Sequence, residues 1–264
     1  MSAWASIEPV AETIRVRVLG FATAGEALGA GEIAIEMPAG SRVEDLRRRL
    51  DADHPGLAPL WPRLAVAVDG ELAAAATLLT DGCEVALLPP VSGGSADPET
   101  ADPDDAGVDP GTGITGLTDD PLDPARAVAA VAGPGRGAVV VFLGTVRDHH
   151  QGRKVAGLAY SAYRPMAAAV LRRIAADLEA AGEDLRAAIV HRLGEVPVGE
   201  PSVVVAIASP HRAAAYEASR TALERLKAEA PIWKRERYAD GSEAWREEEP
   251  LTAPAPAASG TPAR

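Results

Sequence analysis

The sequence predicts a two-domain protein of the α+β class, and three features of its 264 residues support this prediction. Residues 13–90 contain short segments in which apolar and polar side chains alternate, as in half-buried strands, around one helical segment. Residues 95–120 are acidic and rich in Pro and Gly, which is typical of a linker. Strands and helices then intermix without strict alternation. We expect domains at 12–94 and 121–249, a flexible, disordered acidic linker at 95–120 and a disordered tail at 250–264.

The composition excludes several classes of protein. With 47% apolar residues, the chain can form a core in each domain, and a wholly disordered chain is excluded. No apolar run approaches the roughly 20 residues of a membrane-spanning helix, and the N-terminal residues lack the basic-then-apolar order of a secretory signal. We therefore expect a cytoplasmic protein without a membrane partner. The single cysteine, Cys83, cannot form an internal disulfide and is interpreted as a small buried side chain.

The net charge of −12 is distributed unevenly along the chain. Residues 95–124 hold nine acidic residues and no basic residue, whereas residues 125–250 hold 18 basic and 16 acidic residues. The second domain is therefore slightly basic, and it is able to accept a small anion. Because no run rich in Lys or Arg is present, we expect no nucleic-acid partner.

The first domain is predicted to contain four strands and one helix, in the order strand, strand, helix, strand, strand. Ile14, Val16 and Val18 alternate with arginines in the first strand. Ser41 precedes the helix as a candidate N-cap, and Asp69-Gly70 is a hairpin signal. This order suits a small mixed sheet packed around one helix. The elements are expected at residues 13–20, 31–38, 41–50, 64–72 and 83–90.

The first domain ends in an extended arm at residues 87–94, LLPPVSGG, whose last residues are Gly93 and Gly94. Taken alone, a Gly-Gly pair more often begins a linker. Residues 12–94 nevertheless resemble the ubiquitin-like sulfur carriers, specifically the small subunit of molybdopterin synthase. The resemblance implies a β-grasp fold and a terminal glycine carboxyl that is adenylated and then converted to a thiocarboxylate. Two glycines leave a bare backbone that can enter a channel too narrow for a Cβ.

The second domain is predicted to begin with a helix, a GPGRG turn and an apolar strand. The glycine spacing of this turn, with no helix after it, argues against a dinucleotide site. Met166, Val170, Ile174 and Leu178 lie on one stripe of a later helix. The elements are expected as helices at 123–132, 164–182 and 209–231, strands at 138–148, 154–163, 186–196 and 201–209, and a hairpin at 232–249 that turns at Asp240-Gly241.

Lysine usage gives the best indication of chemistry. The chain has 26 basic residues besides histidine, of which only Lys154, Lys227 and Lys234 are lysines. A retained lysine is notable because arginine cannot lose its proton, whereas a partly buried lysine can act as a base or nucleophile. Lys227 and Lys234 lie seven residues apart, and neighbouring Leu and Trp residues favour partial desolvation of both. The alternative is that both are ordinary solvated lysines.

A second group of residues is typical of a phosphate site. In Ser209-Pro210-His211-Arg212 we interpret the serine as an N-cap and the proline as part of the first turn of a helix. A helix N-terminus beside an arginine binds phosphate readily, although a surface His-Arg pair is equally consistent. Arg147 is likewise either a ligand contact or a strand-end charge. Asp148, His149 and His150 are residue types that bind metal ions, but they do not predict a metal site here. Adjacent side chains on an extended segment point apart. His191 lies within a strand and is interpreted as structural.

These residues together resemble the large, catalytic subunit of molybdopterin synthase over about residues 120–248. The motifs that carry the resemblance are FLGTVRDH, HRLGEVPVGE, SPHR and KAEAPIWKRE. The resemblance implies an α/β-hammerhead-like domain that installs two dithiolene sulfurs in cyclic pyranopterin monophosphate, with no tightly bound cofactor and no metal. It also implies that Lys227 and Lys234 are the catalytic pair and that the substrate contacts are Thr145, Val146, Arg147, His211, Arg212, Arg235 and Glu236. The whole chain is similar to a fusion of the two subunits.

The helix predicted at 209–231 is long enough to place two of these residues far apart. Arg212 and Lys227 are 15 residues apart, which separates them by about 22 Å along a helix. One small substrate cannot easily contact both. We therefore expect a homodimer of the second domain, in which the partner subunit supplies His211 and Arg212 to each site.

The fusion creates a chemical requirement at Gly94. A thiocarboxylate needs a free carboxyl group, but Gly94 is joined to Ser95 by a peptide bond. We therefore expect a protease to cut after Gly94 and an activating enzyme to load the sulfur. Two alternatives remain at this point: a non-catalytic ubiquitin-like interaction scaffold, and a sulfur carrier that serves another pathway.

Overall fold

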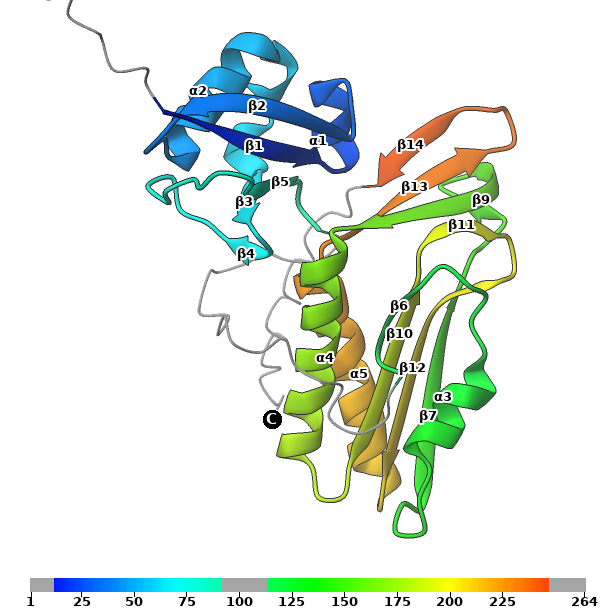
Figure 1. Ribbon diagram of the computed structural model, residues 1–264. Helices are drawn as coiled ribbons and strands as arrows, with labels where there is room; N and C mark the ends of the chain where they lie inside the picture. Colours follow the sequence, from blue (N-terminus) through cyan, green and yellow to red (C-terminus); the bar gives the residue numbers. More distant parts are fainter. Residues whose placement is uncertain (1–11, 92–113, 247–264) are drawn as a thin grey trace, which may run out of the picture.

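The computed structural model describes residues 12–91 and 114–246, which form two domains that lie against each other (Figure 1). Gly93, Gly94, most of the expected linker and the expected tail lie outside the described residues. Within the two described ranges, no helix is long and apolar enough to cross a membrane.

The first domain is a five-stranded mixed sheet that packs against α2 (Val43–Asp53). β1 and β5 run parallel at the centre of the sheet, and β2 is antiparallel to β1 at one edge. The strands are β1 (Thr13–Gly20), β2 (Glu32–Pro38), β3 (Ala65–Val68), β4 (Glu71–Leu72) and β5 (Glu84–Leu88), in the order β2-β1-β5-β3-β4 across the sheet. This arrangement confirms the expected β-grasp fold. Cys83 is buried as expected, and burial raises the pKa of its thiol.

Two local predictions in the first domain were wrong. The sequence analysis missed the short helix α1 (Ala22–Leu28), which ends at Gly29 in the left-handed conformation. The predicted N-cap of α2, Ser41, is instead bonded through its hydroxyl to the Pro38 carbonyl at 2.6 Å. Arg42 is the N-cap, and its backbone N–H donates to the Asp45 carboxylate at 2.8 Å. Two 3-10 turns, at Pro55–Leu57 and Trp61–Arg63, complete the domain.

The second domain contains two sheets. The first has the strand order β6-β10-β12-β7, and the second has the order β11-β9-β13-β14 with β8 paired to β9. The strands are β6 (Gly116–Thr118), β7 (Ala138–Thr145), β8 (His149–His150), β9 (Arg153–Ala162), β10 (Arg186–Arg192), β11 (Gly194–Pro197), β12 (Pro201–Ser209), β13 (Ile232–Tyr238) and β14 (Glu243–Arg246). The last two strands form the expected hairpin. The single strand predicted at 186–196 was wrong, because these residues form β10 and β11, which belong to different sheets.

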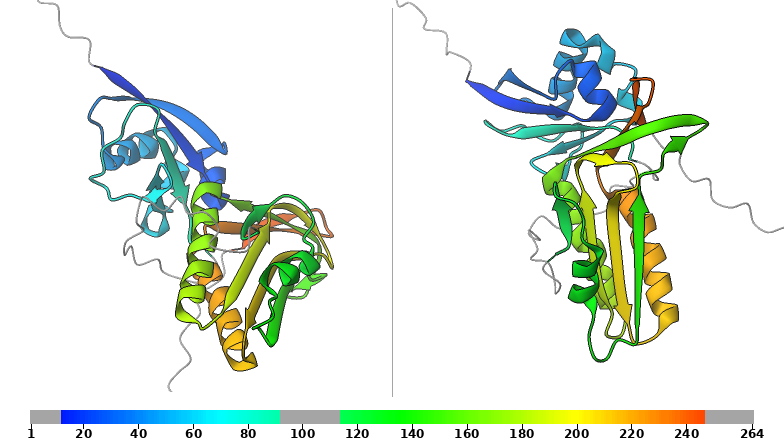
Figure 2. Two further views of the ribbon diagram at one scale, coloured as in Figure 1. Left: turned by 60° about the horizontal axis from the view of Figure 1, so that its bottom comes forward. Right: turned by 90° about the vertical axis from the view of Figure 1, so that its right-hand side faces the viewer.

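Three helices cover the four-stranded sheet. α4 (Arg164–Ala181) and α5 (Arg212–Glu229) pack on one face, and α3 (Pro124–Val131) packs on the other (Figure 2). Val170, Ile174 and Leu178 of the predicted stripe of α4 face this core, whereas Met166 packs against the cluster that contains Tyr163 and Trp233. β12 is buried on both faces as expected, because helices lie on either side of it. The sheet therefore forms a rigid support for the loops at its ends.

The linker prediction needs a correction at its C-terminal end. Residues 114–120, assigned to the linker by composition, contain β6 (Gly116–Thr118), which pairs in parallel with β10. Thr115 is buried, and its hydroxyl accepts a hydrogen bond from the Ile189 N–H at 3.3 Å. These contacts come from a distant part of the chain, so the composition of the segment could not reveal them. The second domain begins before residue 120.

His191 is structural, as expected, and it makes stability depend on pH. His191 is 5% exposed, its ring lies 4.9 Å from the Tyr160 ring, and its Nδ1–H donates to the Arg192 carbonyl at 2.8 Å. Burial lowers the pKa of His191 to about 4. The unfolded chain therefore takes up a proton at higher pH than the folded chain does, and stability falls as pH decreases from about 6.5 to 4.

We predict that proton uptake by His191 in the unfolded chain lowers the free energy of unfolding by about 3 kcal/mol at the acid end of that pH range. Denaturant unfolding of the full chain between pH 7 and pH 4 checks it. His191→Phe keeps an aromatic edge at Tyr160 but cannot take up a proton, so its stability should fall less steeply with acid than that of the wild type. Equal slopes for the two proteins would show that His191 does not carry the effect.

Candidate active site

The two lysines lie close together along the chain, where α5 leads into β13. Lys227 is in the last turn of α5, and Lys234 is the third residue of β13. Lys234 is half-buried, whereas Lys227 is exposed, so the expected desolvation of Lys227 is wrong for a single copy of the chain. The reason is helical geometry: Leu226 points into the core, and the next residue is rotated by about 100° away from it.

Glu236 lies on the same face of β13 as Lys234, because side chains two residues apart in a strand point the same way. Its side chain is 6% exposed, and both carboxylate oxygens have partners. His150 Nδ1 lies 2.7 Å from Oε1, while the Tyr238 hydroxyl at 2.7 Å and the Arg246 Nε at 3.0 Å donate to Oε2. Burial acts to raise the pKa of Glu236, but the hydrogen bonds from Tyr238, Arg246 and His150 hold that pKa below its usual value. Glu236 is therefore ionised and fixed in place.

Arg235 projects from the opposite face of β13. Its guanidinium forms an ion pair with Glu243 at 2.9 Å and lies 5.5 Å from the centre of the Trp245 ring. Arg235 and Trp245 border a hollow of about 480 Å³ whose other wall is the first domain, including Phe21 and Glu26. Arg235 and Glu236, predicted together as substrate contacts, thus face different sides of one strand.

Thr145 is the last residue of β7, and Val146 and Arg147 follow it. Val146 is buried, and its backbone is bonded in both directions to the turn at residues 199–200, with distances of 3.0 and 2.8 Å. Thr145 and Arg147, on either side of it, are exposed. The buried valine therefore anchors a short loop that presents two polar side chains to solvent.

His211 and Arg212 lie at the other end of the four-stranded sheet. Ser209, just before them, pairs with Ala138 at the start of β7, whereas Thr145 is at the end of that strand. α5 begins at Arg212 with His211 as its N-cap, so the predicted N-cap role of Ser209 was wrong. The Ser209 hydroxyl instead accepts a hydrogen bond from the His211 N–H at 3.4 Å.

One copy of the chain therefore does not bring all predicted site residues together. Since α5 runs without interruption from Arg212 to Glu229, Arg212 and Lys227 are separated by about 22 Å along it. Figure 1 shows the start of α5 at the far end of the second domain and its last turn near the first domain. Lys227, in the last turn of α5, and Lys234, next to Trp233 on β13, therefore lie toward the first domain, whereas His211 and Arg212 lie at the other end of α5.

The two domains meet in an aromatic cluster beside Lys234. The Phe21 ring stacks on the Trp233 ring at 5.0 Å and lies 5.6 Å from the Tyr163 ring. The Trp233 Nε1–H donates to the Pro89 carbonyl at 3.2 Å, and Val91 packs against the same cluster. Burial raises the pKa of Tyr163, and the Glu84 carboxylate of the first domain adds to this shift. The arm of the first domain thus runs along the strand that carries Lys234.

Sequence reasoning missed Phe21 and Tyr163 as functional residues. Each is an isolated aromatic residue outside any motif, and their contact joins two separately folded domains. Trp233 was noted only as a neighbour of Lys234. Periodicity identifies the core of one domain and gives no signal for a contact between two domains.

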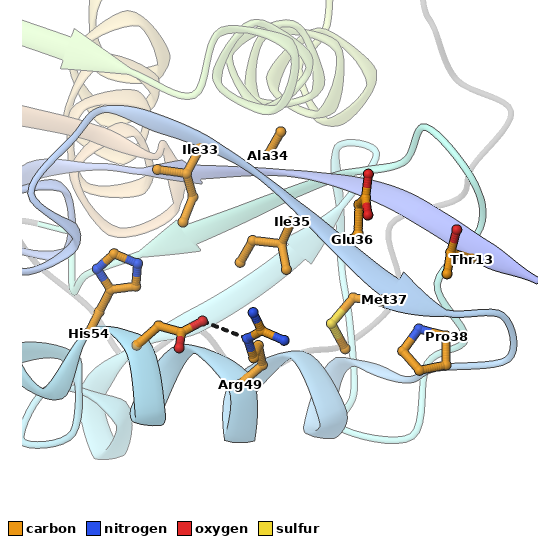
Figure 3. Close-up of a pocket in the computed structure, with 10 residues that line it drawn as sticks. Thr13, Ile33, Ala34, Ile35, Glu36, Met37, Pro38, Arg49 and His54 are labelled. Carbon is orange, nitrogen blue, oxygen red and sulfur yellow. Dashed lines mark hydrogen bonds and ion pairs between the residues drawn. The ribbon is translucent and has the colours of Figure 1, made fainter. Parts of the chain in front are cut away.

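A second hollow, of about 600 Å³, lies in the first domain between β2 and α2 (Figure 3). Ile35 and Met37 form its apolar wall, and Arg49 is paired with Asp53 at 2.5 Å on its other side. None of the predicted site residues borders it. Within the described ranges, no group of three or more His, Cys, Asp or Glu side chains is placed to hold a metal ion.

Comparison with known proteins gives matches to each domain. The family model described as MoaE protein matches residues 117–229, and the ThiS family model matches residues 18–94. A molybdopterin synthase catalytic subunit from Aspergillus niger is 47% identical over 130 residues, which cover 49% of this chain and 72% of the relative. Molybdopterin synthase catalytic subunit 1 from Mycobacterium tuberculosis is 45% identical over 127 residues, which cover 48% of this chain and 86% of the relative.

Among solved structures, molybdopterin synthase from Staphylococcus aureus aligns with a TM-score of 0.49 at 34% identity. The alignment covers 51% of this chain and 97% of that one.

Proposed function

The chain belongs to the family of molybdopterin synthase catalytic subunits, with a sulfur-carrier domain of the ThiS family fused ahead of it, and we propose that it transfers sulfur from its own Gly94. It is a sulfur-transferring enzyme of molybdenum cofactor biosynthesis. The proposed substrate is cyclic pyranopterin monophosphate, and the proposed sulfur donor is a thiocarboxylate formed on Gly94. The proposed product is the molybdopterin dithiolene.

The course of the carrier arm is the observation that supports this proposal. Pro89 accepts the Trp233 Nε1–H bond, and Lys234 is the next residue of β13. Arg246 is the last residue of β14 and pairs with Lys234. Within the described residues, β14 therefore does not extend along β13 as far as Trp233. An arm at Trp233 can therefore pass the edge of β13 toward the face of Lys234. Gly94 follows Val91 by three positions, which gives a reach of about 10 Å.

The proposed roles follow from the positions of the side chains. Lys227 acts as a base or transient covalent partner when the sulfur anion attacks the pterin side chain. Lys234 stabilises the negative charge that develops on the acyl group of the arm. Arg147, with His211 and Arg212, holds the phosphate of the substrate. The other proposed substrate contacts are Thr145, Val146, Arg235 and Glu236.

We infer that the complete site needs two copies of the chain. β7 is the edge strand of its sheet, and Val139, Val141 and Leu143 on it are each about 40% exposed. Such a row of apolar side chains on an open strand edge suits an isologous contact with a second copy. His211 and Arg212 adjoin the start of this strand, and the Thr145–Arg147 loop follows its end. An antiparallel contact between two β7 strands would bring these two groups from different subunits together.

The fused chain has further proposed partners because Gly94 must be freed and loaded. A protease cuts after Gly94, and an adenylating enzyme in the cytoplasm exchanges one carboxyl oxygen for sulfur. The aromatic cluster of Phe21, Tyr163 and Trp233 then holds the cut carrier domain in place without a covalent link.

Reconstitution tests this proposal. Protein cut after Gly94 and carrying the thiocarboxylate is mixed with cyclic pyranopterin monophosphate, and dithiolene formation is followed by its absorbance and by mass. We expect one dithiolene for every two loaded chains, because each thiocarboxylate supplies one sulfur, whereas the same protein with an ordinary carboxyl should form none. No product from loaded protein would favour an interaction scaffold, and transfer only to a different acceptor would favour a carrier for another pathway.

A further inference from the structure

We propose that His150 is the general base for the hydrolytic half of the sulfur transfer, with Glu236 as its positioning residue. This inference rests on the proposed function. His150 was considered above only as a metal ligand. Its Nδ1 lies 2.7 Å from Oε1 of Glu236, and its side chain is 27% exposed, compared with 6% for Glu236. A partly exposed imidazole held by a buried carboxylate is the arrangement of an oriented base.

The carboxylate is fixed, so it can orient the imidazole. The Tyr238 hydroxyl and the Arg246 Nε occupy Oε2 of Glu236, which leaves Oε1 for His150. The Arg246 guanidinium also donates to the Tyr238 hydroxyl at 2.6 Å, which closes the network. Because an ionised carboxylate accepts a hydrogen bond, Nδ1 of His150 carries the hydrogen. The lone pair on Nε2 is then available to accept a proton.

The register of the strands places Glu236, the partner of His150, beside Lys234. Glu236 follows Lys234 by two residues on the same face of β13, a spacing of about 7 Å. Arg246, which bonds to Glu236, is the cross-strand partner of Lys234. Among the described residues, Glu236 contacts His150 directly, and Tyr238 and Arg246 bond to Glu236. Arg153 is the cross-strand partner of His150, and its guanidinium lies over the Tyr238 ring.

The chemistry requires a base at this point. The sulfur anion attacks a carbon of the pterin side chain, so that a C–S bond forms and a C–O bond at that carbon breaks, and the oxygen leaves with the electron pair and takes up a proton. Sulfur then joins the Gly94 carbonyl carbon to the substrate as a thioester. Water attacks that carbon, so that a C–O bond forms and the C–S bond breaks, and the C–S electron pair leaves on the sulfur that stays with the pterin. The water proton passes to Nε2 of His150 and then to solvent. No oxidation or reduction occurs, and both lysines keep their proposed roles.

The test is the rate at which the thioester between carrier and pterin disappears. Loaded, cut protein is mixed with substrate, quenched at intervals and analysed by intact mass. In His150→Gln, the amide can still donate to Glu236 but cannot take a proton, so we expect the adduct to form normally and to decay about 100-fold more slowly. His149→Gln is the matched control, because His149 is 73% exposed and bonded to Asp148 at 2.6 Å. It should behave as the wild type does.

Two further measurements show whether His150 acts as a general base or only supports the structure. The pH profile of the decay rate should differ between the wild type and His150→Gln, because only the wild type has a side chain at this position that can take the proton. Added imidazole should restore decay in His150→Ala. Wild-type decay in His150→Gln, or equal loss of adduct formation and decay without imidazole rescue, would refute the role of His150 alone. Failure of the wild type to form any adduct would refute the proposed function and, with it, this inference.

Discussion

Replacing Lys227 by alanine is expected to lower turnover by about 100-fold to 10,000-fold, the range for loss of a positioned acid or base. The structure predicts no accompanying loss of stability, because Lys227 is exposed at the end of α5. Exposed substitutions of this kind change the free energy of unfolding by about 0.5 kcal/mol or less. Single-turnover dithiolene formation and thermal unfolding of the same preparation measure the two effects separately.

The chain provides a matched control for this variant. Lys154, one of only three lysines, is exposed on β9 and has no proposed part in the site. Lys154→Ala should therefore turn over at the wild-type rate. If Lys227→Ala were as active as Lys154→Ala, Lys227 would have no part in the mechanism. If it were inactive and also unfolded, the result would contradict its exposed position.

Two inactive variants are expected to restore activity when mixed. Arg212→Ala removes a proposed phosphate contact, and Lys227→Ala removes the proposed base, and α5 separates the two positions by about 22 Å. In a shared site, Arg212 of one copy works with Lys227 of the other. A mixed dimer then contains one intact site and one doubly damaged site. After subunit exchange, half of the dimers are mixed, so we expect about a quarter of the wild-type activity.

The mixing experiment has a direct control within the same chain. Arg212→Ala and Lys227→Ala combined in one copy and mixed with Lys227→Ala leave no intact site, so this mixture should remain inactive. Activity in the first mixture and none in the second would show that residues from two subunits meet. No recovery in the first mixture, with subunit exchange shown by mass, would mean that each copy holds its own complete site.

Much of the fold was predictable because local patterns and tertiary packing agree. The strands and helices of the second domain follow from apolar periodicity, since a nearly continuous core covers both faces of β12. β6 was not predictable, because three residues in a polar segment become a strand only by pairing with β10. The N-cap predictions at Ser41 and Ser209 failed for a related reason. Each hydroxyl has a nearby backbone partner outside the helix.

The site was predictable in its chemistry and less so in its arrangement. The preference of the chain for arginine made Lys227 and Lys234 stand out, and helix length alone separated Arg212 from Lys227. The pairing of His150 with Glu236 was not predictable, because it joins the short β8 to β13 across the sheet. The same holds for the stacking of Phe21 on Trp233. Contacts of these kinds depend on how finished elements pack together.

The most direct test of the account is the intact mass of the protein recovered from cells that use it. If the carrier domain is released and loaded with sulfur, the protein should consist of two fragments divided after Gly94. The smaller fragment should be heavier than its sequence predicts by the mass difference between sulfur and oxygen. Substitution of Gly94 by proline should prevent this division and abolish dithiolene formation. A single 27.2 kDa species that nevertheless makes the dithiolene would contradict the account, because its Gly94 carboxyl would never have been free to carry sulfur.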